Sequence, residues 1–389
     1  MNLKEITMEP IRILHVVPNM HRAGLETFIM NVYRNIDREK IQFDFIVHYK
    51  QRFDYDDEIE ALGGKIYRFS VREDNDFIKY IRQLNAFFRR HREYSILHGH
   101  MESFGFIYSK IASRYGVKVI IAHSHTAFVI PTLKGLTKYF MNKPWKYYAT
   151  ELFACSDKAG RFMFPRRRFS IIKNGIECKQ YAYNEGIRKE YRSKFNINNK
   201  TVIGHVGRFN TEKNHKFIVD IFKEYKKIDN NSVLVLVGEG SLLENTKAKV
   251  KQLQLEDSVY FLGVRSDMAN IYQMFDIFIL PSLFEGLPIV GIEAQAAGLP
   301  LLVSGEVTSE LCITDLVHKY SLEASARQWA KEIQHILGIS NRQVTTKTLI
   351  DAGYDIKETA SLLQNYYINK ANYRVPQQIG KSMKKQEEF

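Results

Sequence analysis

The sequence predicts an α/β protein in which two Rossmann-like domains face each other across a cleft. The first observation is that short apolar runs alternate with segments of helical length, which is typical of parallel sheets covered by helices. The second is that this alternation starts afresh near residue 201, again with a strand and a glycine turn. The third is the length, because 389 residues exceed the usual size of one domain.

The first domain is predicted over residues 1–180. It opens with the strand Ile11–Val17, which Pro18 ends, and a loop with Gly24 leads into a helix from about Leu25. Further strands are expected at 42–47, 65–69, 95–100, 117–122, 151–155 and 169–173, with helices at 76–91 and 102–115 and a short one after residue 155. Helical crossovers of this kind join parallel strands.

The second domain is predicted over residues 181–355, with the divide near Asn174–Ile187. Its strands are expected at 201–206, 232–237, 258–262, 276–281 and 300–303, and its helices at 215–228, 240–253, 266–274, 288–297, 323–337 and 342–351. A last helix is expected at 356–370, followed by a basic tail over 371–389. Residues 1–10 and the tail from Val375 have the character of disordered ends.

Composition restricts the class of protein. The chain is 45% hydrophobic and 25% charged, as globular proteins are, and its net charge of +13 suits nucleic acid, an anionic membrane surface or phosphorylated small molecules. The three widely spaced cysteines, Cys155, Cys178 and Cys312, form neither a disulfide framework nor a zinc pattern. With no secretory leader and no run of eighteen apolar residues, a cytoplasmic location is expected.

The most informative stretch is Pro281-Ser-Leu-Phe-Glu285-Gly-Leu-Pro-Ile-Val-Gly-Ile-Glu293. It follows an apolar strand, turns at Gly286, and enters a helix that Pro288 can open. In a parallel sheet, ligands bind beyond the carboxyl ends of the strands, and a helix amino terminus there attracts phosphate. In a continuous helix the two glutamates would lie roughly 12 Å apart along the axis. That separation suits two parts of one extended ligand better than a single glycosidic bond.

The segment E-G-L-P-I-V-G-I-E resembles the signature of retaining nucleotide-sugar glycosyltransferases of the GT-B fold, family 4. This resemblance implies a nucleoside diphosphate sugar as donor, with UDP as the expected nucleotide, and it implies that Glu293 holds the ribose. It also implies that Glu285 acts in catalysis by orienting the sugar, and that Glu285 and the backbone of Gly286, Leu287 and Ile289 hold the sugar. In such enzymes the last helix crosses back onto the first domain, as residues 356–370 are placed to do.

A basic loop follows the first strand of the second domain, in Gly207-Arg208-Phe-Asn-Thr-Glu-Lys213. Its two fixed positive charges lie between a strand end and a helix start, where a diphosphate can be bound. In the resembled family, Arg and Lys at this spacing neutralise the donor diphosphate as the sugar departs. Arg208 and Lys213 are therefore expected to act in catalysis, and neither a metal nor another cofactor is expected.

Several residues of the first domain are candidates for the same cleft. His123 and, second, His125 end a strand at the ligand-binding face, and the resemblance places such a histidine near the transferred sugar. His98 and His100 also end a strand, on the expected acceptor side. Gly24 keeps half of a two-glycine pattern that approaches the donor phosphates in the family, whereas Glu26 is expected to pair with the helix dipole.

Two further positions border the expected cleft. Asn174 lies in an Asn-Gly turn that resembles the family's hinge between domains, and Val264 follows a strand next to the expected nucleotide base. Either segment could equally be a plain turn.

Two basic stretches, residues 128–148 with their interleaved aromatics and Arg166-Arg167-Arg168, suit an anionic membrane interface. Nucleic acid is the competing partner, although the basic residues are spread along the chain rather than gathered in one stripe. A solvated surface without a partner explains them as well.

The sequence is therefore interpreted as a retaining, metal-independent hexosyltransferase, similar to enzymes that build bacterial exopolysaccharide or capsule. It would transfer sugar to a glycan acceptor on a polyprenyl diphosphate, at the inner face of the cell membrane. A GT-B sugar-nucleotide epimerase, which would release the nucleotide without any acceptor, and a basic nucleic-acid-binding protein remain the alternatives. The favoured interpretation, a glycosyltransferase, involves no nucleic-acid partner.

Overall fold

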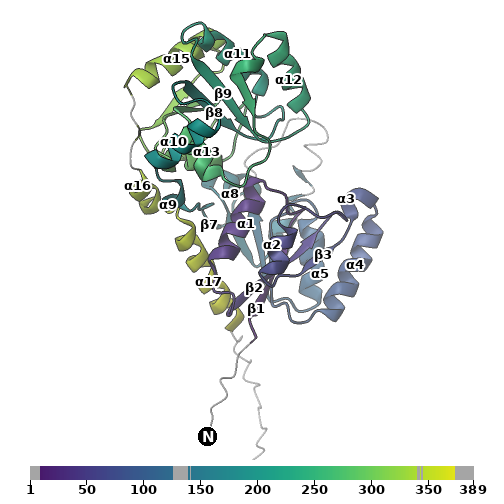
Figure 1. Cartoon of the computed structure of the whole chain (residues 1–389). Helices are drawn as coiled ribbons and strands as arrows, with labels where there is room; N and C mark the ends of the chain where they lie inside the picture. Colours follow the sequence, from purple (N-terminus) through teal and green to yellow (C-terminus); the bar gives the residue numbers. More distant parts are fainter. Residues whose placement is uncertain (1–8, 126–138, 141, 340–341, 343–344, 373–389) are drawn as a thin grey trace, which may run out of the picture.

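Two parallel sheets form the protein, seen one above the other in Figure 1. The structure is a computed structural model and describes residues 9–125, 139–140, 142–339, 342 and 345–372. The first sheet has seven strands in the order β3-β2-β1-β4-β5-β6-β7, and the second has six in the order β10-β9-β8-β11-β12-β13. This confirms the predicted fold class. Of the ends expected to be disordered, residues 1–10 and the tail from Val375, residues 1–8 and the whole tail lie outside the described residues.

The first sheet is built around β1, which pairs in parallel with β2 and β4. Its strands are β1 (Ile11–Val16), β2 (Ile41–Val47), β3 (Ile66–Arg68), β4 (Ile96–Gly99), β5 (Val119–Ser124), β6 (Glu151–Ala154) and β7 (Ser170–Ile171). Its helices include α1 (Gly24–Asn35), α2 (Asp56–Ala61), α3 (Val71–Asp74), α4 (Phe77–Arg90), α5 (Gly105–Arg114), α7 (Trp145–Tyr148) and α8 (Asp157–Met163). Buried side chains fill both faces of the sheet, as a sheet covered by helices requires.

The second sheet places β8 between β9 and β11. Its strands are β8 (Thr201–Val206), β9 (Ser232–Val237), β10 (Val259–Phe261), β11 (Ile277–Leu280), β12 (Leu301–Ser304) and β13 (Val317–Tyr320). Its helices include α9 (Cys178–Tyr181), α10 (Glu185–Lys194), α11 (His215–Lys226), α12 (Leu243–Gln252), α13 (Met268–Met274), α14 (Ile289–Ala296), α15 (Ala326–Ile339) and α16 (Thr346–Asp351). Because β8 and β11 are parallel neighbours, the loops that follow them leave the sheet at the same edge.

Several elements were not predicted from the sequence, among them α2, α3, α10 and β13. Helix α10 has few apolar residues and so lacks a clear helical period, but Asn184 caps it by accepting a hydrogen bond from the Ile187 N–H at 3.0 Å. Strand β13 is interrupted by His318 and Lys319, and it pairs only at the edge of the sheet. Both elements form through tertiary contacts that hydrophobic periodicity does not report.

The chain crosses between its halves twice at one place. Ile176 donates its N–H to the carbonyl of Tyr354 at 2.9 Å and accepts from the N–H of Ile356 at 3.0 Å. From there α17 (Ile356–Asn372) runs down beside the first half in Figure 1. Leu363 and Tyr367 of this helix are buried in the core cluster that contains β1 and α1 residues, which confirms the predicted crossing helix.

Candidate active site

The loops after β8 and β11 lie side by side at the carboxyl edge of the second sheet. The N–H of Leu283 donates to the carbonyl of Glu212 at 2.8 Å, and the side-chain amide of Asn214 donates to the carbonyl of Pro281 at 3.2 Å. The predicted cationic loop and the predicted glutamate loop are therefore held together by hydrogen bonds.

Lys213 and Glu285, two predicted catalytic residues, form a direct ion pair through Nζ and Oε1. The Glu285 oxygen also accepts from the Ser282 hydroxyl at 2.9 Å. Both charged side chains are largely buried, with 17% and 14% of their surfaces exposed. A pair so little exposed is only weakly screened by salt, so the carboxylate is fixed in position and neutralised before any ligand arrives.

The turn before α14 supplies unused donors beside this ion pair. Pro288 caps the helix in an extended conformation, and no hydrogen bond of the described residues uses the backbone N–H of Gly286, Leu287 or Ile289. The first N–H groups of a helix carry partial positive charge and bind anions. The three residues predicted to hold the sugar through their backbone thus present free donors.

Glu293 lies one turn into α14 and is 8% exposed. Its two oxygens accept hydrogen bonds from the hydroxyls of Tyr181 and Tyr272, each at 2.9 Å. Burial raises the pKa of Glu293, and the two phenol hydrogen bonds partly oppose this. Each oxygen keeps a lone pair for a further donor, such as a hydroxyl of a sugar ring.

Arg208 is exposed, and no described residue forms a hydrogen bond or ion pair with its side chain. Its loop is attached to the end of β9, because the Gly207 N–H donates to the Val237 carbonyl at 2.9 Å. At Gly238, where φ is +133°, a Cβ would lie 2.2 Å from the Gly207 oxygen, so only glycine permits this close approach. The arginine is thus carried on a tightly fixed loop with its guanidinium free.

The first half reaches this site through the start of α1. A Cβ at Gly24 would lie 3.6 Å from Cδ1 of Ile289, so the predicted Gly24 loop borders the start of α14. Glu26, predicted as a helix-start acid, lies in the first turn of α1 but is 6% exposed. Burial raises the pKa of Glu26 to about 7, and the positive charge of Arg208 acts in the opposite direction. The interaction brings α1 and the Arg208 loop into one neighbourhood.

The predicted histidines form a buried cluster instead of lining an open surface. His98 Nε2 and His123 Nδ1 share a hydrogen bond at 3.1 Å. His100 and His125 share another at 3.1 Å. The other ring nitrogen of His98, Nδ1, forms a hydrogen bond with the Tyr367 hydroxyl at 2.6 Å. His15 joins through His100 at 3.0 Å. Burial lowers the pKa of every member, to about 3 for His15 and His125. At neutral pH these imidazoles are uncharged.

His123, the first choice among them, is fully buried, and its Nε2 has no hydrogen-bond partner among the described residues. Its place near the transferred sugar stays a prediction. Asn174 is also buried with an unpaired side-chain oxygen, beside the crossing of the chain. Val264 is 44% exposed after β10. Its contact with a nucleotide base likewise stays a prediction.

Two histidine sets could hold a metal ion, since the ring nitrogens within each set lie within 4.8 Å of one another: His15, His98 and His100, and His100, His123 and His125. Neither set includes a carboxylate. Of the acidic pair in Asp54-Tyr-Asp56, Asp54 bonds to His21 and Asp56 to Arg68. None of these groups lies among the loops after β8 and β11.

Sequence reasoning missed the residues that support the glutamates. Tyr181 and Tyr272 lie 112 and 21 residues before Glu293, and no spacing rule links them to it. Ser282 lies three residues before Glu285, so a search for local hydroxyl donors would have found it. Cys155 is buried, and burial raises the pKa of its thiol to about 11.

Comparison with known proteins shows the family. A profile described as "Glycosyl transferases group 1" matches residues 187–348. The putative glycosyltransferase EpsF of Bacillus subtilis (strain 168) is 32% identical over 380 residues, covering 92% of this chain and 96% of that protein. The chain belongs to this glycosyltransferase family.

One further relative and one solved structure are also similar to this glycosyltransferase. The UDP-Gal:alpha-D-GlcNAc-diphosphoundecaprenol alpha-1,3-galactosyltransferase of Escherichia coli is 26% identical, covering 77% of this chain and 80% of that enzyme. The crystal structure of Anabaena Alr3699/HepE in complex with UDP and glucose matches with a TM-score of 0.72 at 16% identity, covering 92% of this chain and 97% of that one. The second likeness concerns the fold, which is the GT-B arrangement expected from the sequence.

Proposed function

We propose that this glycosyltransferase is a retaining, metal-independent enzyme that transfers a sugar from a UDP-sugar to a glycan carried on a polyprenyl diphosphate, in exopolysaccharide or capsule synthesis. The observation that carries the proposal is the Lys213–Glu285 ion pair beside the free N–H groups at the start of α14. A cation, a fixed carboxylate and unused backbone donors are what a sugar diphosphate requires.

The donor would lie across the loops after β8 and β11. Arg208 and Lys213 would bind the diphosphate, Glu293 would accept hydrogen bonds from the ribose hydroxyls, and Glu285 would accept from the sugar. The backbone N–H groups of Gly286, Leu287 and Ile289 would complete the sugar site. Support comes from HepE, a neighbour in fold, which was solved with UDP and glucose.

In the proposed reaction the bond between C1 of the sugar and the diphosphate oxygen breaks, and a bond from C1 to the acceptor hydroxyl forms on the same face. The acceptor proton passes to the leaving phosphate oxygen. Glu285 is already engaged with Lys213 and Ser282, so its role is to orient the sugar rather than to attack it. Arg208 and Lys213 would stabilise the charge that develops on the leaving diphosphate. His123 and Gly24 would border the site from the first half.

The acceptor would approach against residues 1–180, with residues 181–355 holding the donor and the helix 356–370 linking the two. A lipid-linked acceptor is the substrate named for the Escherichia coli relative, and it would place the enzyme at the inner face of the cell membrane. Within the described part of the chain, no helix combines the length and the apolar character needed to cross a bilayer. The proposed contact with the membrane is peripheral.

The test is transfer of radiolabelled sugar from a panel of UDP-sugars to a polyprenyl-diphosphate-linked acceptor, with anomeric configuration read by NMR. The expected result is acceptor-dependent transfer with retention, unaffected by EDTA. Glu285→Gln should lower kcat by about a hundredfold or more, whereas Glu244→Gln, an exposed acid on α12, should not.

Near wild-type transfer by Glu285→Gln would refute the proposed role of Glu285. Inversion at C1 would refute the retaining mechanism. Release of UDP with equal speed in the absence of any acceptor would indicate an epimerase.

A further inference from the structure

A second basic site lies at the opposite edge of the second sheet from the candidate active site. A cavity of about 690 Å³ is bounded there by residues that precede or begin the strands, among them Thr201 at the start of β8 and Asp276 just before β11. A strand of six residues is about 20 Å long, so this cavity is separated from the Arg208 loop by the length of β8. It is not part of the proposed donor site.

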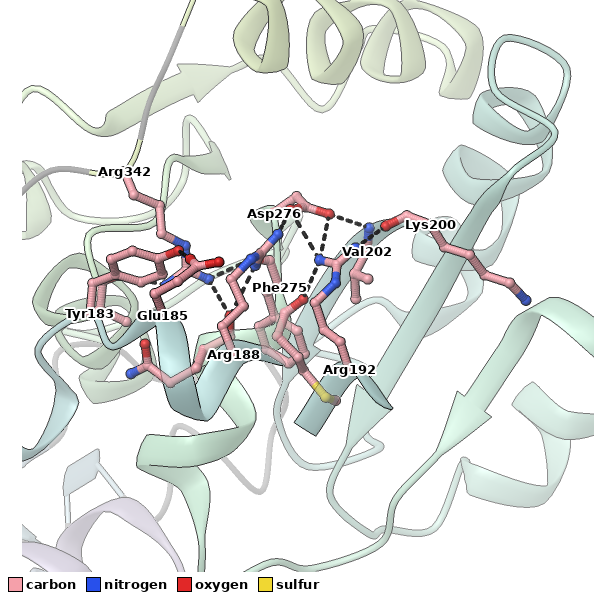
Figure 2. Close-up of polar contacts among 12 residues, drawn as sticks. Tyr183, Glu185, Arg188, Arg192, Lys200, Val202, Phe275, Asp276 and Arg342 are labelled. Carbon is pink, nitrogen blue, oxygen red and sulfur yellow. Dashed lines mark hydrogen bonds and ion pairs between the residues drawn. The ribbon is translucent and has the colours of Figure 1, made fainter. Parts of the chain in front are cut away.

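Three arginines gather at this cavity around one carboxylate (Figure 2). Arg188 and Arg192 project from α10, and both pair with Asp276, the second at 3.2 Å. Arg342 approaches from the other side and has no carboxylate partner among the described residues. Among the described residues, the three guanidinium groups form ion pairs with Asp276 alone, and the nearby Glu185 is instead paired with Lys189.

The arginines are anchored by the end of α13. Arg188 donates to the carbonyls of Gln273 and Phe275 at 3.0 and 2.9 Å, and Arg342 donates to that of Gln273 at 2.8 Å. Arg192 donates to the Met274 carbonyl at 3.0 Å. A helix end contributes about half a negative charge, so this capping fixes the guanidinium groups without neutralising the cluster.

Donors remain for a ligand. The contacts of the three arginines with the described residues all use Nη1 or Nη2, and none uses Nε. The ring of Tyr183 lies 4.5 Å from the Arg342 guanidinium carbon, and its hydroxyl bonds to the exposed Glu185. Burial, with a smaller contribution from Arg188, lowers the pKa of Arg342 to about 9. A bound anion would offset both the burial of the Arg342 charge and its repulsion by Arg188.

We propose that this cavity binds a small phosphorylated anion through Arg188, Arg192 and Arg342. Fixed, partly buried guanidinium groups in excess over carboxylates are the usual phosphate ligands of proteins. The volume lies within the range of small-molecule sites. This inference is independent of the proposed donor site, because the two use different residues at opposite ends of the strands.

Binding of pyrophosphate is measured by isothermal titration calorimetry in full-length protein carrying Arg208→Gln and Lys213→Gln, which removes the cations of the donor site. In that background, adding Arg188→Gln should weaken binding by about tenfold or more, the worth of a charged hydrogen bond. Adding Asp276→Asn should strengthen binding, because it removes the competing carboxylate. Arg168→Gln, an exposed arginine of the first half, is the matched control and should change nothing.

If these residues had a purely structural role, Arg188→Gln and Asp276→Asn would not be expected to change pyrophosphate affinity in opposite directions. The proposal would be overturned if the protein carrying Arg208→Gln and Lys213→Gln did not bind pyrophosphate, or if neither added substitution changed its affinity for pyrophosphate. If an added variant fails to fold, protection of Arg188, Arg192 and Arg342 from phenylglyoxal by pyrophosphate, mapped by mass spectrometry in the unaltered chain, decides the matter. Equal modification with and without pyrophosphate would refute the site.

Discussion

At the scale of single residues, each acid of the candidate site has surroundings of its own. Glu285 forms an ion pair with Lys213, whereas Glu293 is buried and accepts from two phenols. Glu26 is buried, and the positive charge of Arg208 partly opposes the rise in its pKa. One neighbourhood thus holds an ion-paired acid and two buried acids whose pKa values are raised, and differences of this kind separate chemical roles within a site.

Glu26 makes stability depend on pH. Its folded pKa of about 7 lies above the ordinary value of 4.5, so the fold favours the neutral acid, and the free energy of unfolding should fall as pH rises from about 4.5 to about 7. The loss should reach about 3 kcal/mol, because each pH unit between the two pKa values contributes roughly 1.4 kcal/mol. Urea denaturation of wild type and Glu26→Gln across this range measures it.

In Glu26→Gln this part of the pH dependence should be absent, while Glu39→Gln, an exposed acid, should behave as wild type. Identical pH profiles for wild type and Glu26→Gln would contradict the assignment.

At the scale of elements, the double crossing near Ile176 joins the two halves. Gly175 lies against the start of α17, where a Cβ would approach the backbone N and Cα of Ile356 to 2.9 Å. The segment around Gly175 and the start of α17 cannot separate without breaking the hydrogen bonds between Ile176, Tyr354 and Ile356. The position requires glycine because of this close approach.

Gly175→Ala should therefore lower the free energy of unfolding by about 1–3 kcal/mol, the usual cost of overpacking. Gly338→Ala is the contrasting control, because a Cβ there meets nothing within 4 Å and alanine favours a helix by up to about 1 kcal/mol. Chemical denaturation followed by circular dichroism compares the two. A Gly175→Ala protein as stable as wild type would contradict the tight crossing.

Elements with strong local sequence signals could be predicted, whereas contacts between distant segments mostly could not. Strands β8 and β11 and helix α14 carry strong local signals, so these elements were predicted close to their observed bounds. The sequence predicted that Lys213 and Glu285 serve one site, but it did not predict their direct ion pair, which spans 72 residues. The partners of Glu293, the burial of His123 and the weakly apolar α10 depend on packing between distant segments, which the sequence does not display.

At the scale of the whole molecule, the first half exposes apolar side chains on α4 beside basic ones. Phe77, Ile78 and Ile81 are 45%, 65% and 39% exposed, and Lys79 and Arg82 are exposed next to them. The stretch predicted for membrane contact, residues 128–148, lies partly outside the described residues, although Phe140 and Tyr147 are also exposed, at 63% and 68%. Apolar groups among basic ones suit an anionic lipid surface.

Ile78→Glu should reduce cosedimentation with phosphatidylglycerol vesicles by about tenfold, because it removes roughly 1.5 kcal/mol or more of apolar burial and adds a repelled charge. Leu362→Glu, at a residue of α17 that is 54% exposed, should leave binding unchanged. Equal effects of both substitutions would indicate that α4 does not contact the membrane.

We propose that cations and carboxylates from distant parts of the chain bind one nucleotide sugar at the carboxyl edge of the second sheet. The decisive measurement is a crystal structure with UDP bound. Phosphate oxygens are expected within hydrogen-bond distance of Arg208 and Lys213, and ribose hydroxyls at the carboxylate of Glu293. UDP bound elsewhere, with the Lys213–Glu285 loops empty, would contradict it.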